Sequence, residues 1–198
     1  MKDKIIGKAK ELFLKLGFKS ITMDDIAGEM CISKKTIYKY FANKEILIEE
    51  STQVLTEEVN HSINTIVDKG YNAIEENFEI RRMFRDMFRS TETSPIFQLK
   101  KHYPEIYAKL QSNQIKECES FFRQNIEKGM AQGLYRKDIN IEVYIRFYYT
   151  LIFSINENTA SETEAFQLEK IALEYHTRAM ATEAGVIELE KHLLNPII

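Results

Sequence analysis

The sequence contains few of the residues that form tight turns: seven glycines and three prolines are spread over 198 residues. An all-β fold needs many such turns, so their scarcity favours helices. Tryptophan is absent, and Cys31 and Cys118 are the only cysteines. Two distant cysteines cannot form a disulfide framework, and we expect both to be small, buried thiols in a reducing compartment.

Long apolar runs are also missing. No stretch approaches the roughly 20 apolar residues that a membrane-spanning helix needs. The N-terminus begins with mixed charge and lacks the apolar segment of a signal peptide. The sequence therefore predicts a soluble, cytoplasmic protein.

Enzyme signatures are absent as well. The sequence has no phosphate-binding glycine loop, no dinucleotide-binding fingerprint and no HExxH motif. The histidines lack metal-ligand spacing and lie at His61, His102, His176 and His192. We therefore predict no enzyme, no catalytic residue, no metal and no cofactor. A histidine or acid pair that converges in space would be the remote enzymatic alternative.

The net charge of −3 is unevenly distributed. Residues 1–50 hold ten lysines against eight acidic residues, whereas residues 51–198 have a balance of −5. A helical domain acquires so modest an imbalance by chance, so the basic N-terminal segment indicates a nucleic-acid partner only together with other features.

Capping patterns predict three helices in the first fifty residues. Apolar residues at three- and four-residue spacing predict the first, at about 2–16, ending at Gly17 in a left-handed conformation. Phe18 would fold back on Phe13, as in a Schellman motif. Hydroxyl N-caps at Thr22 and Ser33 predict short helices at about 23–30 and 34–41.

The second short helix has the character of a recognition helix. Only a tight turn separates it from its predecessor, which is the geometry that inserts a helix into the major groove of DNA. Ile37 and Phe41 share one face and would pack on the first helix. The other face carries basic and aromatic residues, namely Lys34, Lys35, Tyr38 and Lys39. The alternative is that these lysines form only a solvated surface.

This segment resembles the TetR family of bacterial regulators. The resemblance covers roughly residues 5–50 and rests on Ala9-x-x-Leu12-Phe13-x-x-x-Gly17-Phe18, Ile21-Thr22-Met23-Asp24-Asp25-Ile26-Ala27, Ile32-Ser33-Lys34-Lys35-Thr36-Ile37-Tyr38-Lys39-Tyr40-Phe41 and Asn43-Lys44-Glu45-x-Leu47. Two positions depart from the family pattern: Cys31 stands where a turn glycine is usual, and Lys35 replaces a small residue.

The resemblance implies DNA contacts from Thr22, Ser33, Lys34, Lys35, Thr36, Tyr38, Lys39, Tyr40 and Lys44. We expect Lys35 and Thr36 to contact bases, and Tyr38, Tyr40 and Lys44 to anchor phosphates. The resemblance also implies the architecture. It is all-α, with a helix-turn-helix DNA-binding domain over residues 1–47 joined by a long helix to a helical ligand-binding and dimerisation domain over residues 48–198.

A homodimer would place two recognition helices on two half-sites. Predicted helices near 141–156 and 163–181 carry apolar stripes, and the resemblance implies that they pair with their symmetry mates. The predicted interface consists of Val143, Phe147, Leu151, Ile155, Leu168, Ile171 and Tyr175. The alternative is that both stripes face the chain's own core.

The middle helices are rich in methionine and aromatic residues, which are suited to an apolar ligand pocket. The candidate ligand-binding residues are Met83, Phe84, Met87, Phe88, Tyr103, Tyr107, Phe122, Tyr144 and Tyr148, although each is also a candidate for plain core. Arg81, Arg82 and Arg85 would be solvated, and an inward-facing one would hold an anionic ligand.

These observations predict a dimeric transcription regulator that binds a double-stranded DNA operator. It would be a repressor released by a small hydrophobic or amphipathic inducer, with no membrane partner. One alternative is a DNA-binding regulator without an inducer, controlled by a protein partner. A purely structural helical adaptor is another, but it leaves the lysine–tyrosine face unexplained.

Overall fold

The computed structural model describes residues 1–194, except for the side chains of residues 113–117. The described residues form ten helices: α1 (Lys2–Leu16), α2 (Met23–Glu29), α3 (Lys34–Tyr38), α4 (Lys44–Val67), α5 (Ala73–Phe88), α6 (Pro95–His102), α7 (Pro104–Ala131), α8 (Ile141–Asn158), α9 (Glu162–Met180) and α10 (Glu183–Leu194). None of these helices is long and apolar enough to cross a membrane. The all-α prediction is confirmed.

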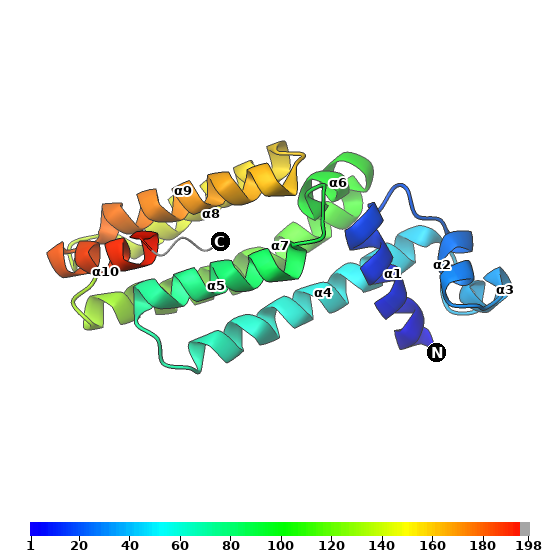
Figure 1. Ribbon diagram of the computed structural model, residues 1–198, viewed down its shortest axis with the longest axis horizontal. Helices are drawn as coiled ribbons and strands as arrows, with labels where there is room; N and C mark the ends of the chain where they lie inside the picture. The colour runs from blue at the N-terminus through cyan, green and yellow to red at the C-terminus, as the bar shows by residue number, and fades with distance from the viewer. Residues whose placement is uncertain (195–198) are drawn as a thin grey trace.

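Helices α1–α3 gather at one end of the molecule, and α4 runs from them along the helical body (Figure 1). Helix α4 packs on α1 in its first half and on α5 and α7 further along. Because one continuous helix belongs to both units, the predicted domain boundary at residues 47/48 falls within its first turn. Helices α8 and α9 lie side by side on the opposite side of the body from α4.

Two apolar clusters hold the chain together. The first contains the buried faces of α1–α3 and the start of α4, and it extends to Leu99, Ile106 and Tyr107 of α6 and α7. The second lies among α5, α7, α8, α9 and α10. The N-terminal helices α1–α3 therefore share their core with the helical body.

The end of α1 differs from the predicted Schellman motif. Phe18 does stack on Phe13, with ring centroids 5.5 Å apart. However, Gly17 has φ 91° and ψ 145°, which is a glycine-specific conformation outside the left-handed helical region. The amide of Phe18 donates to Oε1 of Gln98 at 2.8 Å instead of to a carbonyl of α1. A residue of α6 thus replaces the expected local partner.

Two helix lengths also differ from prediction. Helix α3 ends at Tyr38 instead of Phe41, although the amide of Phe41 still donates to the carbonyl of Ile37 at 3.1 Å. After Gly185 the sequence predicts only a last turn or two of helix, but α10 has twelve residues. Gly185 lies inside α10, where its missing side chain allows close approach to the carbonyl of Leu134.

The turn between α2 and α3 contains a strained residue. Cys31 has φ 52°, the only non-glycine residue of positive φ among the described residues. Its side chain is exposed, so the prediction of a buried thiol is wrong here, because the tight turn directs the side chain outward. A side chain in this conformation costs about 1–2 kcal/mol.

We predict that Cys31→Gly raises the free energy of unfolding by up to about 1 kcal/mol, because relief of this strain exceeds the entropy that glycine adds to the unfolded chain. Urea denaturation measures the change. Cys31→Ala is the matched control, since it removes the thiol but keeps the Cβ, and it should give no gain. Equal stability of the glycine and alanine variants would contradict the strain.

Candidate functional site

Helix α3 presents the face that the sequence predicts. Ile37 and Phe41 are fully buried against the first apolar cluster, whereas Tyr38 and Tyr40 are 45% and 44% exposed. Lys35 and Lys39 are also exposed. The orientation of α3 follows from its alternation of apolar and polar residues, and it leaves a surface of cationic and aromatic groups.

Side-chain caps fix the starts of the helices that frame this surface. The Thr22 hydroxyl accepts from the amide of Asp25 at 3.2 Å, and the Asp25 carboxylate accepts from the Thr22 amide at 2.8 Å, which completes a capping box. The Ser33 hydroxyl accepts from the Thr36 amide at 3.1 Å. Asn43 caps α4 in the same way. The predicted caps at Thr22 and Ser33 are therefore confirmed. Both side chains are exposed, but their hydroxyls already form hydrogen bonds within the chain.

The lysines around α3 differ in their surroundings. Lys34 forms an ion pair with Asp24 at 2.6 Å. Lys44 is half-buried, and its Nζ donates to the carbonyl of Lys19 at 3.2 Å. Its ammonium also lies over the rings of Phe13 and Tyr103, and burial lowers its pKa. Lys44 thus has structural contacts in addition to its predicted role at phosphate.

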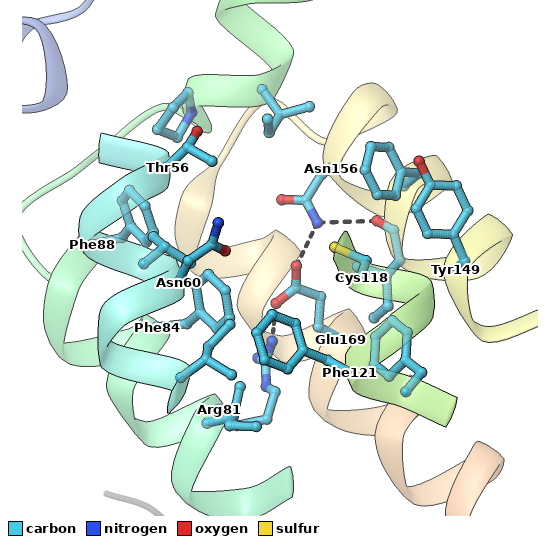
Figure 2. Close-up of a pocket in the computed structure, with 18 of the residues that line it drawn as sticks. Thr56, Asn60, Arg81, Phe84, Phe88, Cys118, Phe121, Tyr149, Asn156 and Glu169 are labelled. Atoms are coloured by element: carbon cyan, nitrogen blue, oxygen red, sulfur yellow. Dashed lines mark hydrogen bonds and ion pairs between the residues drawn. The ribbon is translucent and has the colours of Figure 1, made fainter. Parts of the chain in front are cut away.

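A cavity of about 280 Å³ lies between α4, α5, α6, α7, α8 and α9. Figure 2 shows Thr56, Asn60 and two phenylalanines, Phe84 and Phe88, across the cavity from Cys118 and Tyr149. The N-terminal segment that holds α1–α3 contributes one wall residue, Phe18. The walls are mainly aliphatic and aromatic, a composition typical of small-molecule sites.

A buried ion pair lies at the side of this cavity. Arg81 of α5 pairs with Glu169 of α9, and both side chains are nearly buried. The Asn156 amide donates to the same carboxylate (Figure 2). The Arg81 guanidinium also donates to the carbonyl of Phe166 at 3.0 Å and lies 4.2 Å from the centre of the Phe166 ring. Its charge is therefore already neutralised within the protein.

Two polar atoms on the cavity wall have no hydrogen-bond partner. They are the Tyr149 hydroxyl and Oε2 of Glu162, both buried. Burial raises the pKa of the Glu162 carboxyl to about 7, with the Glu169 carboxylate contributing in the same direction and Arg81 and a hydrogen bond from Ser94 opposing. Buried polar groups are normally satisfied, so these two atoms mark a place where a bound molecule could supply the missing partner.

The cavity includes some of the predicted ligand-binding residues and excludes others. Phe84, Phe88, Phe122 and Tyr148 line it, but Met83, Met87, Tyr103, Tyr107 and Tyr144 do not. Tyr103 and Tyr107 pack in the first apolar cluster, and their hydroxyls bond to the carbonyl of Phe18 and to Glu157. Tyr144 packs near His176. The sequence did not predict that Glu162, Glu169 and Asn156 line the cavity, because these polar residues belong to no recognisable motif.

The predicted dimerisation residues divide into two groups. Phe147, Ile171 and Tyr175 are 64%, 63% and 71% exposed, and Leu168 is also exposed. Leu151 and Ile155 pack in part on the second apolar cluster, and Val143 is half-buried. An isolated chain therefore exposes an apolar surface on α8 and α9, which in a soluble protein typically marks an interaction site.

Comparison with known proteins gives matches at both levels, sequence and fold. A family model described as bacterial regulatory proteins, tetR family, matches residues 5–51. The negative transcriptional regulator IcaR of the biofilm operon icaADBC from Staphylococcus epidermidis is 30% identical over 112 residues, which are 57% of this chain and 54% of IcaR. The chain thus spans about half the length of the curated relatives it matches. These relatives are regulators of transcription, not enzymes.

Solved structures of regulators share the fold over most of the chain. A transcriptional regulator from Cytophaga hutchinsonii has a TM-score of 0.72 and 19% identity, covering 91% of this chain and 98% of its own. NemR from E. coli in its reduced form also has a TM-score of 0.72, with 14% identity, 92% of this chain and 98% of its own. Thermus thermophilus FadR in complex with lauroyl-CoA has a TM-score of 0.60 and 18% identity, covering 92% and 96%.

We predict that ionisation of Glu162 destabilises the fold as the pH rises. The folded protein keeps this proton up to about pH 7, whereas the unfolded chain releases it in the usual glutamate range, so stability falls across that window. The advantage in Tm of Glu162→Gln over the wild type should therefore grow between about pH 5 and about pH 8.

Buried His176 titrates in the opposite sense, because burial lowers its pKa to about 4, but it is present in both proteins and cancels in the difference. The exposed neighbour Glu164 provides the matched control, and Glu164→Gln should follow the wild type at every pH. Parallel Tm curves for the wild type and Glu162→Gln would refute the assignment.

Proposed function

Because the chain belongs to the TetR family of bacterial regulatory proteins, we propose that it is a homodimeric repressor of transcription in the cytoplasm. It binds a double-stranded DNA operator through α3, and a small hydrophobic or amphipathic inducer releases it. The description of IcaR as a negative regulator supports repression, and the lauroyl-CoA bound to FadR supports an amphipathic ligand.

The orientation of α3 is the observation that carries this proposal. Burial of Ile37 and Phe41 fastens the helix to its support while Lys35, Tyr38 and Lys39 face solvent. Cationic groups bind phosphates, and side chains at the N-terminal end of a recognition helix reach base edges. A helix turned by half a rotation would bury Tyr38 and offer Phe41 to DNA.

The cavity favours control by an inducer over control by a protein partner. Its walls include Phe18 of the DNA-binding unit and Thr52 and Leu55 of α4. A molecule in this space would contact both units. It would change DNA binding if its affinity differs between two arrangements of those units.

A gel-shift titration against the DNA upstream of the chain's own gene tests the proposed function. We predict that Lys44→Ala weakens binding to all sequences alike and flattens the dependence of log K on log salt by about 2 per dimer, because each protomer loses about one phosphate contact. Lys35→Ala should instead change the sequence preference.

Lys137→Ala removes the same charge from the loop before α8, at the opposite end of the body from α3, and serves as the control (Figure 1). Because Lys44 also bonds to Lys19, a thermal melt of Lys44→Ala must show that the fold persists. A folded Lys44→Ala protein with the wild-type salt slope would disprove the phosphate contact, and the absence of any DNA binding by the wild type would disprove the proposed function.

The apolar surface of α8 and α9 provides a separate test of the homodimer. We predict that Ile171→Glu converts a dimer of the 23.3 kDa chain into a monomer in sedimentation experiments, because the charge would be buried without a partner at the interface. Leu16→Glu changes another exposed apolar residue, on α1, and should leave the dimer intact. A wild-type protein that sediments as a monomer at micromolar concentration would contradict this part of the proposal.

A further inference from the structure

The charges on the wall of the cavity determine which ligands it accepts. Arg81 and Glu169 neutralise each other, and Glu76 is paired with Lys128 at 2.7 Å and with the amide of Asn125. Glu162 remains as an acidic group without a cationic partner among the described residues. The cavity therefore has an excess of negative charge when Glu162 is ionised.

The position of Glu162 directs this charge into the cavity. Glu162, Phe166, Glu169 and Leu173 recur along α9 at helical spacing, and all four line the cavity. Oε2 of Glu162 is buried and lacks a hydrogen-bond partner. The Ser94 side chain hydrogen-bonds to this carboxyl, but no cationic side chain among the described residues forms an ion pair with it, and a buried carboxylate without a cation is costly.

The aromatic residues of the cavity fit the same kind of ligand. Nine of the lining side chains are aromatic, and Tyr149 among them also offers its hydroxyl: Phe18, Phe84, Phe88, Phe121, Phe122, Tyr148, Tyr149, Phe153 and Phe166. Aromatic faces attract cations, and apolar walls accept the rest of a hydrophobic molecule.

We infer that this cavity binds a hydrophobic organic cation, whose positive group pairs with Glu162 while its apolar part lies among the phenylalanine rings. The inference rests on the proposed function, in which the cavity is the inducer site, and it specifies the charge of the inducer. The volume of about 280 Å³ limits the ligand to a small molecule.

An anionic ligand is disfavoured by the same contacts. Arg81 is the cationic group on the cavity wall among the described residues, and Glu169, the Phe166 carbonyl and the Phe166 ring already occupy it. An anion would have to displace Glu169 and would then face two unpaired carboxylates. The expectation that an inward-facing arginine holds an anionic ligand therefore does not fit this geometry.

Three probes of nearly equal shape separate the possibilities. They are 4-phenylbutyltrimethylammonium, its neutral analogue with a tert-butyl group in place of trimethylammonium, and 5-phenylpentanoate. Binding of each to the full chain without DNA is measured by isothermal titration calorimetry at about pH 8, where Glu162 is ionised. The protein variants are wild type, Glu162→Gln and Glu164→Gln.

We expect the cation to bind the wild type about tenfold or more tightly than the neutral analogue, because a buried ion pair with good geometry favours the charged ligand. Glu162→Gln should lose this preference while keeping its affinity for the neutral analogue. Glu164→Gln changes the same charge on the exposed side of the same helical turn and should behave like the wild type.

Three results would overturn the inference: equal affinity for the cation and the neutral analogue, tighter binding of the carboxylate, or no binding of any probe. A gel shift on the same preparation distinguishes failure of the inference from failure of the proposed function. DNA binding without cation binding would leave a regulator with a different inducer, whereas cation binding without DNA binding would leave the cavity assignment intact.

Discussion

The backbone amide and the backbone carbonyl of Phe18 are both held by the helical body. Its amide donates to Gln98 at 2.8 Å, and its carbonyl accepts from the Tyr103 hydroxyl at 3.3 Å. The Phe18 ring is buried against Phe13 and also reaches the cavity. Gly17 permits this arrangement, because a Cβ there would lie 2.7 Å from the Gln98 oxygen. This turn and its two partners therefore add to α4 and the shared apolar cluster in setting the orientation of the DNA-binding unit on the body.

A second constraint is the cost of buried charge inside the body. Arg81 and Glu169 satisfy each other, and Asn156 completes the shell of the carboxylate. Removing one member of such a network would leave a buried charge, which is far more costly than the network is stabilising. Glu162 has a hydrogen bond from Ser94 but no ion-pair partner among the described residues, and its Oε2 lacks a partner, so it is held less firmly than Glu169. The cavity thus combines a fixed ion pair with an adjustable carboxylate.

Much of the DNA-binding unit could be predicted from the sequence because its determinants are local. Thr22 and Ser33 cap the helices that follow them by accepting from backbone amides three residues away, and the burial of Ile37 follows from helical periodicity. The end of α1 could not be predicted, because the partner of Phe18 lies eighty residues along the chain. The cavity was predicted only in part for the same reason. The aromatic composition of the middle helices made Phe84 and Tyr107 equal candidates for ligand binding. Tertiary packing places Phe84 in the cavity wall and Tyr107 in the first apolar cluster.

The cavity and the turn at Phe18 are not independent. Helix α6 places Ile96 and Leu99 on the cavity side and Gln98 against Phe18, so a displacement of this helix changes both sites. Close-packed interiors transmit such a displacement because they cannot deform continuously. Under the proposed function, a molecule in the cavity would change the orientation of α3 if its affinity differs between two packings of the helices that line the cavity, α6 among them. A ligand that fits both packings equally would bind without releasing DNA, however tightly it is held.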